Sequence, residues 1–141
     1  MSEWFWYAVA AAILYGLHQI FTKLASNQIG EGLGGFVVEA TATLTIVLYL
    51  LIIWLSGKWN QPVNSSGVLY SALTGVCVGA GTIAFFLLFQ KGGPLSAVPV
   101  ILAVGAALMA VAGIAFFKEK PTVERLIGII LSIVGLFLLR K

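Results

Sequence analysis

Long runs of apolar residues are the feature that most restricts the fold of this chain. Five runs can be drawn, each of about 18 to 24 residues, and a helix of roughly 20 residues crosses a 30 Å hydrocarbon layer. They cover residues 4–25, 36–56, 67–90, 94–117 and 122–139. A backbone surrounded by lipid must satisfy its own hydrogen bonds, so runs of this length predict helices. We therefore expect an all-α, polytopic membrane bundle of five transmembrane helices that forms a single domain over residues 1–141.

The low charge content supports this assignment and excludes other classes of protein. Only 9% of the residues are charged, against about 25% in a typical soluble domain. The basic residues lie at the ends of the apolar runs, without the interleaved aromatic residues of a nucleic-acid surface. We find no metal-ligand cluster, no nucleophile beside a base and no phosphate-binding loop. The expected partners are therefore the lipid bilayer and a small molecule, with no nucleic acid, no metal, no cofactor and no enzymatic activity.

A polar stripe interrupts the first apolar run. Tyr15, His18, Gln19 and Thr22 follow the i, i+3, i+4, i+7 spacing that places side chains on one face of a helix. Each of these groups would cost a few kcal/mol if it faced hydrocarbon without a partner, so the stripe should face other helices or a wet cavity. We expect these four residues to bind the substrate, although His18 can equally be a histidine that only packs.

Glu39 is the acidic residue that can lie inside an apolar run, and two interpretations remain open. Residues 40–56 are uncharged, so Glu39 can lie at the headgroup level, where the helix dipole favours a carboxylate near a helix start. Alternatively, Glu39 and His18 lie near the same membrane interface and can meet. An imidazole beside a carboxylate binds and releases protons near neutral pH, which would make His18 and Glu39 a proton-coupling pair.

Small residues and prolines indicate where the helices bend and pack. Pro99 lies inside the fourth run, where we expect it to bend the helix because it lacks a backbone N–H group. Ser71, Gly75 and Gly79 form a small-residue ridge that allows another helix to approach closely.

The basic residues are evenly divided between the two ends of the expected helices. Orientation in the membrane normally follows an excess of Lys and Arg on one side. The side of the N-terminus would carry Lys58, Lys118, Lys120 and Arg125, and the opposite side would carry Lys23, Lys91, Arg140 and Lys141. This balance permits insertion in both directions.

Several motifs resemble the drug/metabolite transporter superfamily, of the EamA-like type related to small multidrug resistance proteins. The segment FQKGGPLSAVP (residues 89–99) is similar to a turn and helix start of that superfamily, and FFKEKP (116–121) is similar to its apolar run with a charged end. The first run, with its Tyr-Gly and FTKLAS segments, resembles the first helix of an EamA repeat. The resemblance covers nearly the whole chain and implies a prokaryotic inner-membrane transporter.

The same resemblance implies roles for residues near the C-terminus. Ala103-Val-Gly105 falls where small multidrug resistance proteins have a glycine kink used in alternating access. Gly128, Ser132 and Gly135 fall in a motif through which those proteins form dimers. However, Tyr15 occupies the place of their essential membrane glutamate, so the cation-binding mechanism of that group is not expected here.

Two functions remain open at this stage. In the first, the chain is one five-helix repeat that works as an antiparallel homodimer, a secondary transporter subunit that moves a small polar or amphipathic metabolite by alternating access. In the second, it is an accessory subunit, or one half of a heterodimer with a related subunit, and does not transport on its own.

Overall fold

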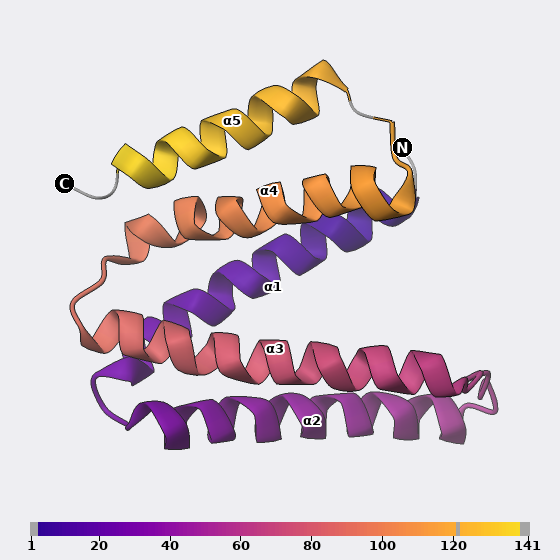
Figure 1. Cartoon of the computed structure of the whole chain (residues 1–141). Helices are drawn as coiled ribbons and strands as arrows, with labels where there is room; N and C mark the ends of the chain where they lie inside the picture. Colours follow the sequence, from indigo (N-terminus) through magenta and orange to yellow (C-terminus); the bar gives the residue numbers. More distant parts are fainter. Residues whose placement is uncertain (1–2, 121, 139–141) are drawn as a thin grey trace. The chain divides into compact units, whose positions relative to one another are not determined.

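The computed structural model describes residues 3–120 and 122–138, without the side chains of Glu3, Arg125, Ser132, Ile133, Leu136 and Phe137. Throughout this part of the chain the regular structure is helical and there is no strand, which confirms the all-α prediction. The elements are α1 (Glu3–Ser26), α2 (Glu31–Leu55), α3 (Ser65–Gln90), the short 3₁₀ helix η1 (Leu95–Ala97), α4 (Val98–Phe117) and α5 (Val123–Leu138) (Figure 1).

Four segments of the described chain, α1, α2, α3 and η1 with α4, are long and apolar enough to cross a membrane. The fifth helix, α5, has 16 residues, which corresponds to about 24 Å at 1.5 Å per residue. None of the most apolar window of α2 is buried inside the chain. These exposed apolar surfaces suit contact with lipid or with further helices, and they make the chain a multi-pass integral membrane protein.

The helices group into two compact units, residues 1–93 and 94–141, which are described separately. In the first unit α3 packs against both α2 and α1, and α2 runs antiparallel beside it (Figure 1). The side chains of Phe86 and Phe89 on α3 are 0% and 1% exposed and are the most deeply buried large residues of this unit. The aromatic end of α3 is therefore the centre of its packing.

Helix α2 begins earlier than the sequence indicated. The second apolar run was expected to begin at Phe36, but the helix starts at Glu31 and includes Gly32, Gly34 and Gly35. Glycine is a poor helix former, so propensity alone gave the wrong boundary. Packing explains the difference, because a Cβ atom at Gly34 would overlap the Phe86 ring and one at Gly35 would lie 3.3 Å from Ile83 Cγ1.

This close approach of α2 and α3 does not use the ridge expected on α3. A Cβ atom added at Gly75 or Gly79 would meet no atom within 4 Å, and Ser71 is exposed. Where α2 meets α3, the glycines at the close contact therefore lie on α2, at Gly34 and Gly35.

In the second unit α4 packs along α5. The expected bend at Pro99 is wrong, because the α-helix begins at Val98 and Pro99 lies in its first turn, directly after the 3₁₀ turn of η1. A proline costs little there, since the first N–H groups of a helix have no partner inside the helix. At its other end α4 stops at Lys118, whose φ of 55° is left-handed.

Candidate functional site

The polar stripe of α1 lies mainly against the interior of the structure. Gln19 is 7% exposed and Thr22 is 2% exposed, whereas His18 is half-buried. Tyr15 is 66% exposed, and its ring lies edge-on to the His18 ring with 6.5 Å between centroids. Three of the four predicted residues therefore gather on the buried side of α1, and Tyr15 borders them from outside.

Within the described residues, two buried polar atoms of this stripe have no hydrogen-bond partner. These are Nδ1 of His18 and Oε1 of Gln19. Thr22 differs, because its hydroxyl donates to the His18 carbonyl oxygen at 2.8 Å. An unsatisfied buried polar atom costs about 1–3 kcal/mol, so His18 and Gln19 are the stripe residues whose side chains have hydrogen-bonding capacity left for a ligand.

Glu39 contacts α3 and not His18. Its Oε1 atom accepts a hydrogen bond of 2.8 Å from the Thr82 hydroxyl, and within the described residues it forms no hydrogen bond or ion pair with His18. Because α2 starts at Glu31, Glu39 lies roughly two turns, or about 12 Å, inside the helix. The coupling of His18 with Glu39 therefore stays a prediction. The partner that the sequence did not reveal is Thr82, which is 4% exposed.

Thr82 could not be recognised from local sequence because its partner lies on another helix. A threonine in an apolar helix can bond to the carbonyl oxygen four residues earlier, and the threonines of α2 do so. There Thr41, Thr43 and Thr45 donate to the carbonyl oxygens of Val37, Glu39 and Thr41. The Thr82 hydroxyl likewise lies 3.0 Å from the carbonyl oxygen four residues earlier, that of Val78. Its second contact, with the Glu39 carboxylate, depends on how α2 and α3 are aligned.

Lys23 is a second residue whose contacts were not foreseen. Its Nζ atom donates to the Gly93 carbonyl oxygen at 3.1 Å and lies 5.1 Å from the centre of the Phe89 ring. The amide of Gln90 likewise donates to the Ile29 carbonyl oxygen at 3.2 Å. These bonds connect the C-terminal end of α3 and the residues after it to α1 and to the loop after α1. They hold α1 and α3 together close to the polar stripe.

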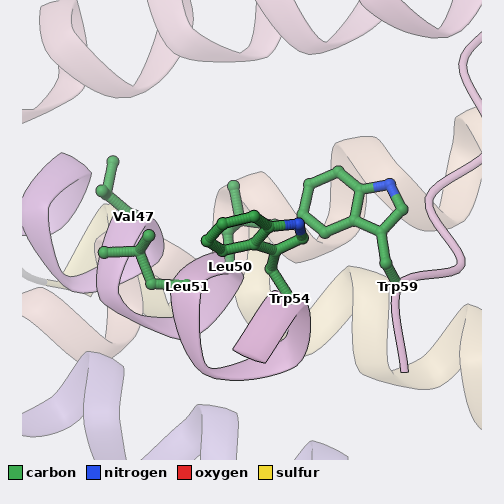
Figure 2. A pocket seen from close by; sticks show the side chains of 5 residues that line it. All are labelled: Val47, Leu50, Leu51, Trp54 and Trp59. Carbon is green, nitrogen blue, oxygen red and sulfur yellow. The ribbon is translucent and has the colours of Figure 1, made fainter. Parts of the chain in front are cut away.

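Among the hollows of the first unit, two lie at opposite ends of α2. One, of about 390 Å³, is polar and is lined by residues 26–30 and Gln90. The other, of about 500 Å³, is apolar and is lined by Val47, Leu50, Leu51, Trp54 and Trp59 (Figure 2). Both tryptophans are exposed, which suits the expected headgroup level, where such rings concentrate. The polar hollow begins at Ser26, one turn beyond Thr22 on α1.

The predicted contact residues of the second unit are only partly exposed. Gly135 already packs within the chain, since a Cβ atom there would lie 3.3 Å from Val100 Cγ1 on α4, whereas Cβ atoms at Gly105 and Gly128 would meet nothing within 4 Å. The side chain of Ser132 lies outside the described residues. A dimer contact through α5 stays a prediction. Nowhere in the described ranges do three His, Cys, Asp or Glu residues meet as a possible metal site.

Comparison with known proteins identifies a family. The family model of the EamA-like transporters matches residues 2–141. The chain is similar to an uncharacterised transporter of a Sinorhizobium species from the cobO 3′ region, with 26% identity over 143 residues, 98% of this chain and 96% of the relative. It is also similar to an uncharacterised protein of Methanocaldococcus jannaschii, with 29% identity over 129 residues, 91% of this chain and 89% of the relative. No solved structure matches the chain.

Proposed function

The chain belongs to the EamA-like transporter family, and we propose that it is a carrier subunit that moves a small polar or amphipathic metabolite by alternating access. The substrate binds on the buried stripe of α1, where His18 and Gln19 supply hydrogen bonds. Thr22 stabilises the helix at the stripe through its hydrogen bond to the His18 carbonyl oxygen. Tyr15, beside the His18 ring, closes the site from the exposed side.

The observation that carries this proposal is the pair of unpartnered atoms, His18 Nδ1 and Gln19 Oε1. Helices that only pack in a membrane satisfy their polar groups, because lipid offers no hydrogen bonds. Intramembrane ionisable residues commonly mark a substrate or ion pathway. A substrate with hydrogen-bond donors and acceptors supplies the missing partners, and hydrocarbon does not.

A second subunit is part of this proposal. Alternating-access carriers place the substrate between two repeats related by inverted symmetry, and this chain resembles one repeat. A second copy, inserted in the opposite direction, supplies the other half and presents its own stripe across the site.

Transport by purified protein in liposomes tests the proposal. Charge movement or uptake is recorded for a panel of neutral, zwitterionic and anionic metabolites, first with the wild-type chain and then with His18→Ala and Gln19→Ala. We expect both variants to remain monodisperse in detergent and to lose at least tenfold in transport. Gln28→Ala is the matched control, because Gln28 is exposed in the turn directly after α1 and its side chain donates to the Leu24 carbonyl oxygen.

Two outcomes contradict the proposal. If His18→Ala and Gln19→Ala both transport as fast as the wild-type protein, the substrate does not bind on the α1 stripe. Absence of transport for every compound in the panel, from a folded protein, favours the accessory or heterodimer function, in which the stripe contacts a different chain.

A further inference from the structure

Glu39 and Thr82 form a contact between two helices that the binding of a substrate to α1 does not require. The carboxylate oxygen Oε1 of Glu39 lies 2.8 Å from the Thr82 hydroxyl, which also lies 3.0 Å from the carbonyl oxygen of Val78. Thr82 is almost completely buried and Glu39 is half-buried. The position is roughly two turns inside α2, so the carboxylate is held in an apolar segment.

The Thr82 hydroxyl has one hydrogen but lies within bonding distance of two acceptors. A hydroxyl donates one hydrogen bond and accepts through its lone pairs, so Thr82 donates either to Glu39 or to Val78 at a given moment. If Glu39 is ionised, Thr82 donates to the carboxylate. If Glu39 is protonated, the carboxyl O–H donates to Thr82, which then donates to Val78. The same heavy-atom positions therefore satisfy both protonation states.

No described side chain other than Thr82 bonds to the Glu39 carboxylate. On α3, the titratable residues Tyr70 and Cys77 are exposed. On α1, Lys23 directs its ammonium group to the Gly93 carbonyl oxygen, and Nδ1 of His18 is without a partner. Within the described residues, Thr82 is therefore the hydrogen-bond partner of the carboxylate, and no cation is bonded to it.

We propose that Glu39 and Thr82 form a reversible proton-binding site between α2 and α3, with the Thr82 hydroxyl exchanging its acceptor as the proton arrives or leaves. The proton is taken from water, adds to Oε1 of Glu39 and returns to water, and no other bond is made or broken. Protonation removes a charge from the apolar segment, which lowers the cost of bringing the Glu39 side chain into contact with hydrocarbon when the helices rearrange. The further role of this site, coupling proton binding to transport, rests on the proposed carrier function.

Infrared spectroscopy tests the site without a substrate. The absorption of protonated carboxyl groups is followed across a pH titration of the purified wild-type protein, and subtracting the spectra of Glu39→Gln isolates the Glu39 contribution. We expect a reversible Glu39 component. In Thr82→Val both protonation states of Glu39 lose their hydroxyl partner, but the ionised carboxylate loses the stronger, charge-assisted bond, so the pH dependence of the Glu39 component should differ from that of the wild-type protein.

Thr82→Ser keeps the hydroxyl and should titrate like the wild-type protein, which separates hydrogen bonding from packing if the valine variant folds poorly. Thr74→Val is the matched control on the same helix, because Thr74 donates only to the Tyr70 carbonyl oxygen. Absence of a Glu39 component overturns the site, and equal titrations of Thr82→Val and Thr74→Val overturn the role of Thr82. Since no substrate is present, failure to find a transported metabolite leaves this result unchanged.

Discussion

Gly34 is the residue at which the packing of α2 on α3 is most sensitive to change. A Cβ atom there would overlap the Phe86 ring, and Phe86 is fully buried. Overpacking a close contact typically costs about 1–3 kcal/mol. The carboxylate of Glu39 lies on the same helix and reaches Thr82 across the same contact, so the distance set by Gly34 also sets the position of the candidate proton site.

We expect Gly34→Ala to destabilise the protein by about 1–3 kcal/mol because Phe86 must move away from α2. Thermal unfolding in detergent measures this effect. Gly75→Ala is the control, since a Cβ atom has open space there and alanine is the better helix former. Equal melting temperatures for the two variants would contradict the close contact at Gly34.

Among the helices, the long apolar runs could be predicted from sequence and several of their ends could not. The length and hydropathy of an apolar run can be read directly from the sequence, and they predicted correctly that two helices end near Gln90 and Phe117. The start of α2 depends on Phe86, far away in the sequence, and so propensity misplaced it. The α1 stripe was foreseen because its spacing is local, whereas Thr82 became visible only with the α2–α3 register.

Pro99 also carries a prediction about a helix. Because it lies in the first turn of α4, Pro99→Ala should change the melting temperature little, corresponding to less than about 1 kcal/mol, whereas a proline inside a helix costs about 3 kcal/mol or more. The comparison variant is Ala106→Pro, in the middle of α4. A large loss of stability in Pro99→Ala would restore a structural role for a proline bend.

Helix α5 offers two glycines with different expected effects. Gly135→Leu should lower the stability of the chain itself, because Gly135 already contacts Val100. Gly128→Leu should leave the α4–α5 contact in place and shift the protein toward monomer on size exclusion, if α5 forms the dimer contact through its small residues. A stable dimer in Gly128→Leu would move the contact away from this part of α5, with the ridge of Ser71, Gly75 and Gly79 on α3 as the next candidate.

For the whole molecule, the proposed carrier function requires a second half that is related to this chain by inverted symmetry. The relatives from Sinorhizobium and Methanocaldococcus match this chain over 96% and 89% of their own lengths, so chains of about this size recur. A parallel homodimer would form a site whose two ends differ. An antiparallel homodimer provides the inverted symmetry of alternating access, and the even division of the eight basic residues permits it.

We therefore expect the chain to insert in both directions. Single cysteines placed at Gln28 and Asn60, in a Cys77→Ala background, label the loops at the two ends of α2, and both positions are exposed. A membrane-impermeant thiol reagent applied to intact cells should label about half of each variant, with the rest labelled only after the membrane is opened. Insertion in one direction would make Gln28 fully accessible and Asn60 inaccessible, or the reverse. Such a result would exclude the antiparallel homodimer, and the other half of the carrier would then have to come from a different chain inserted in the opposite direction.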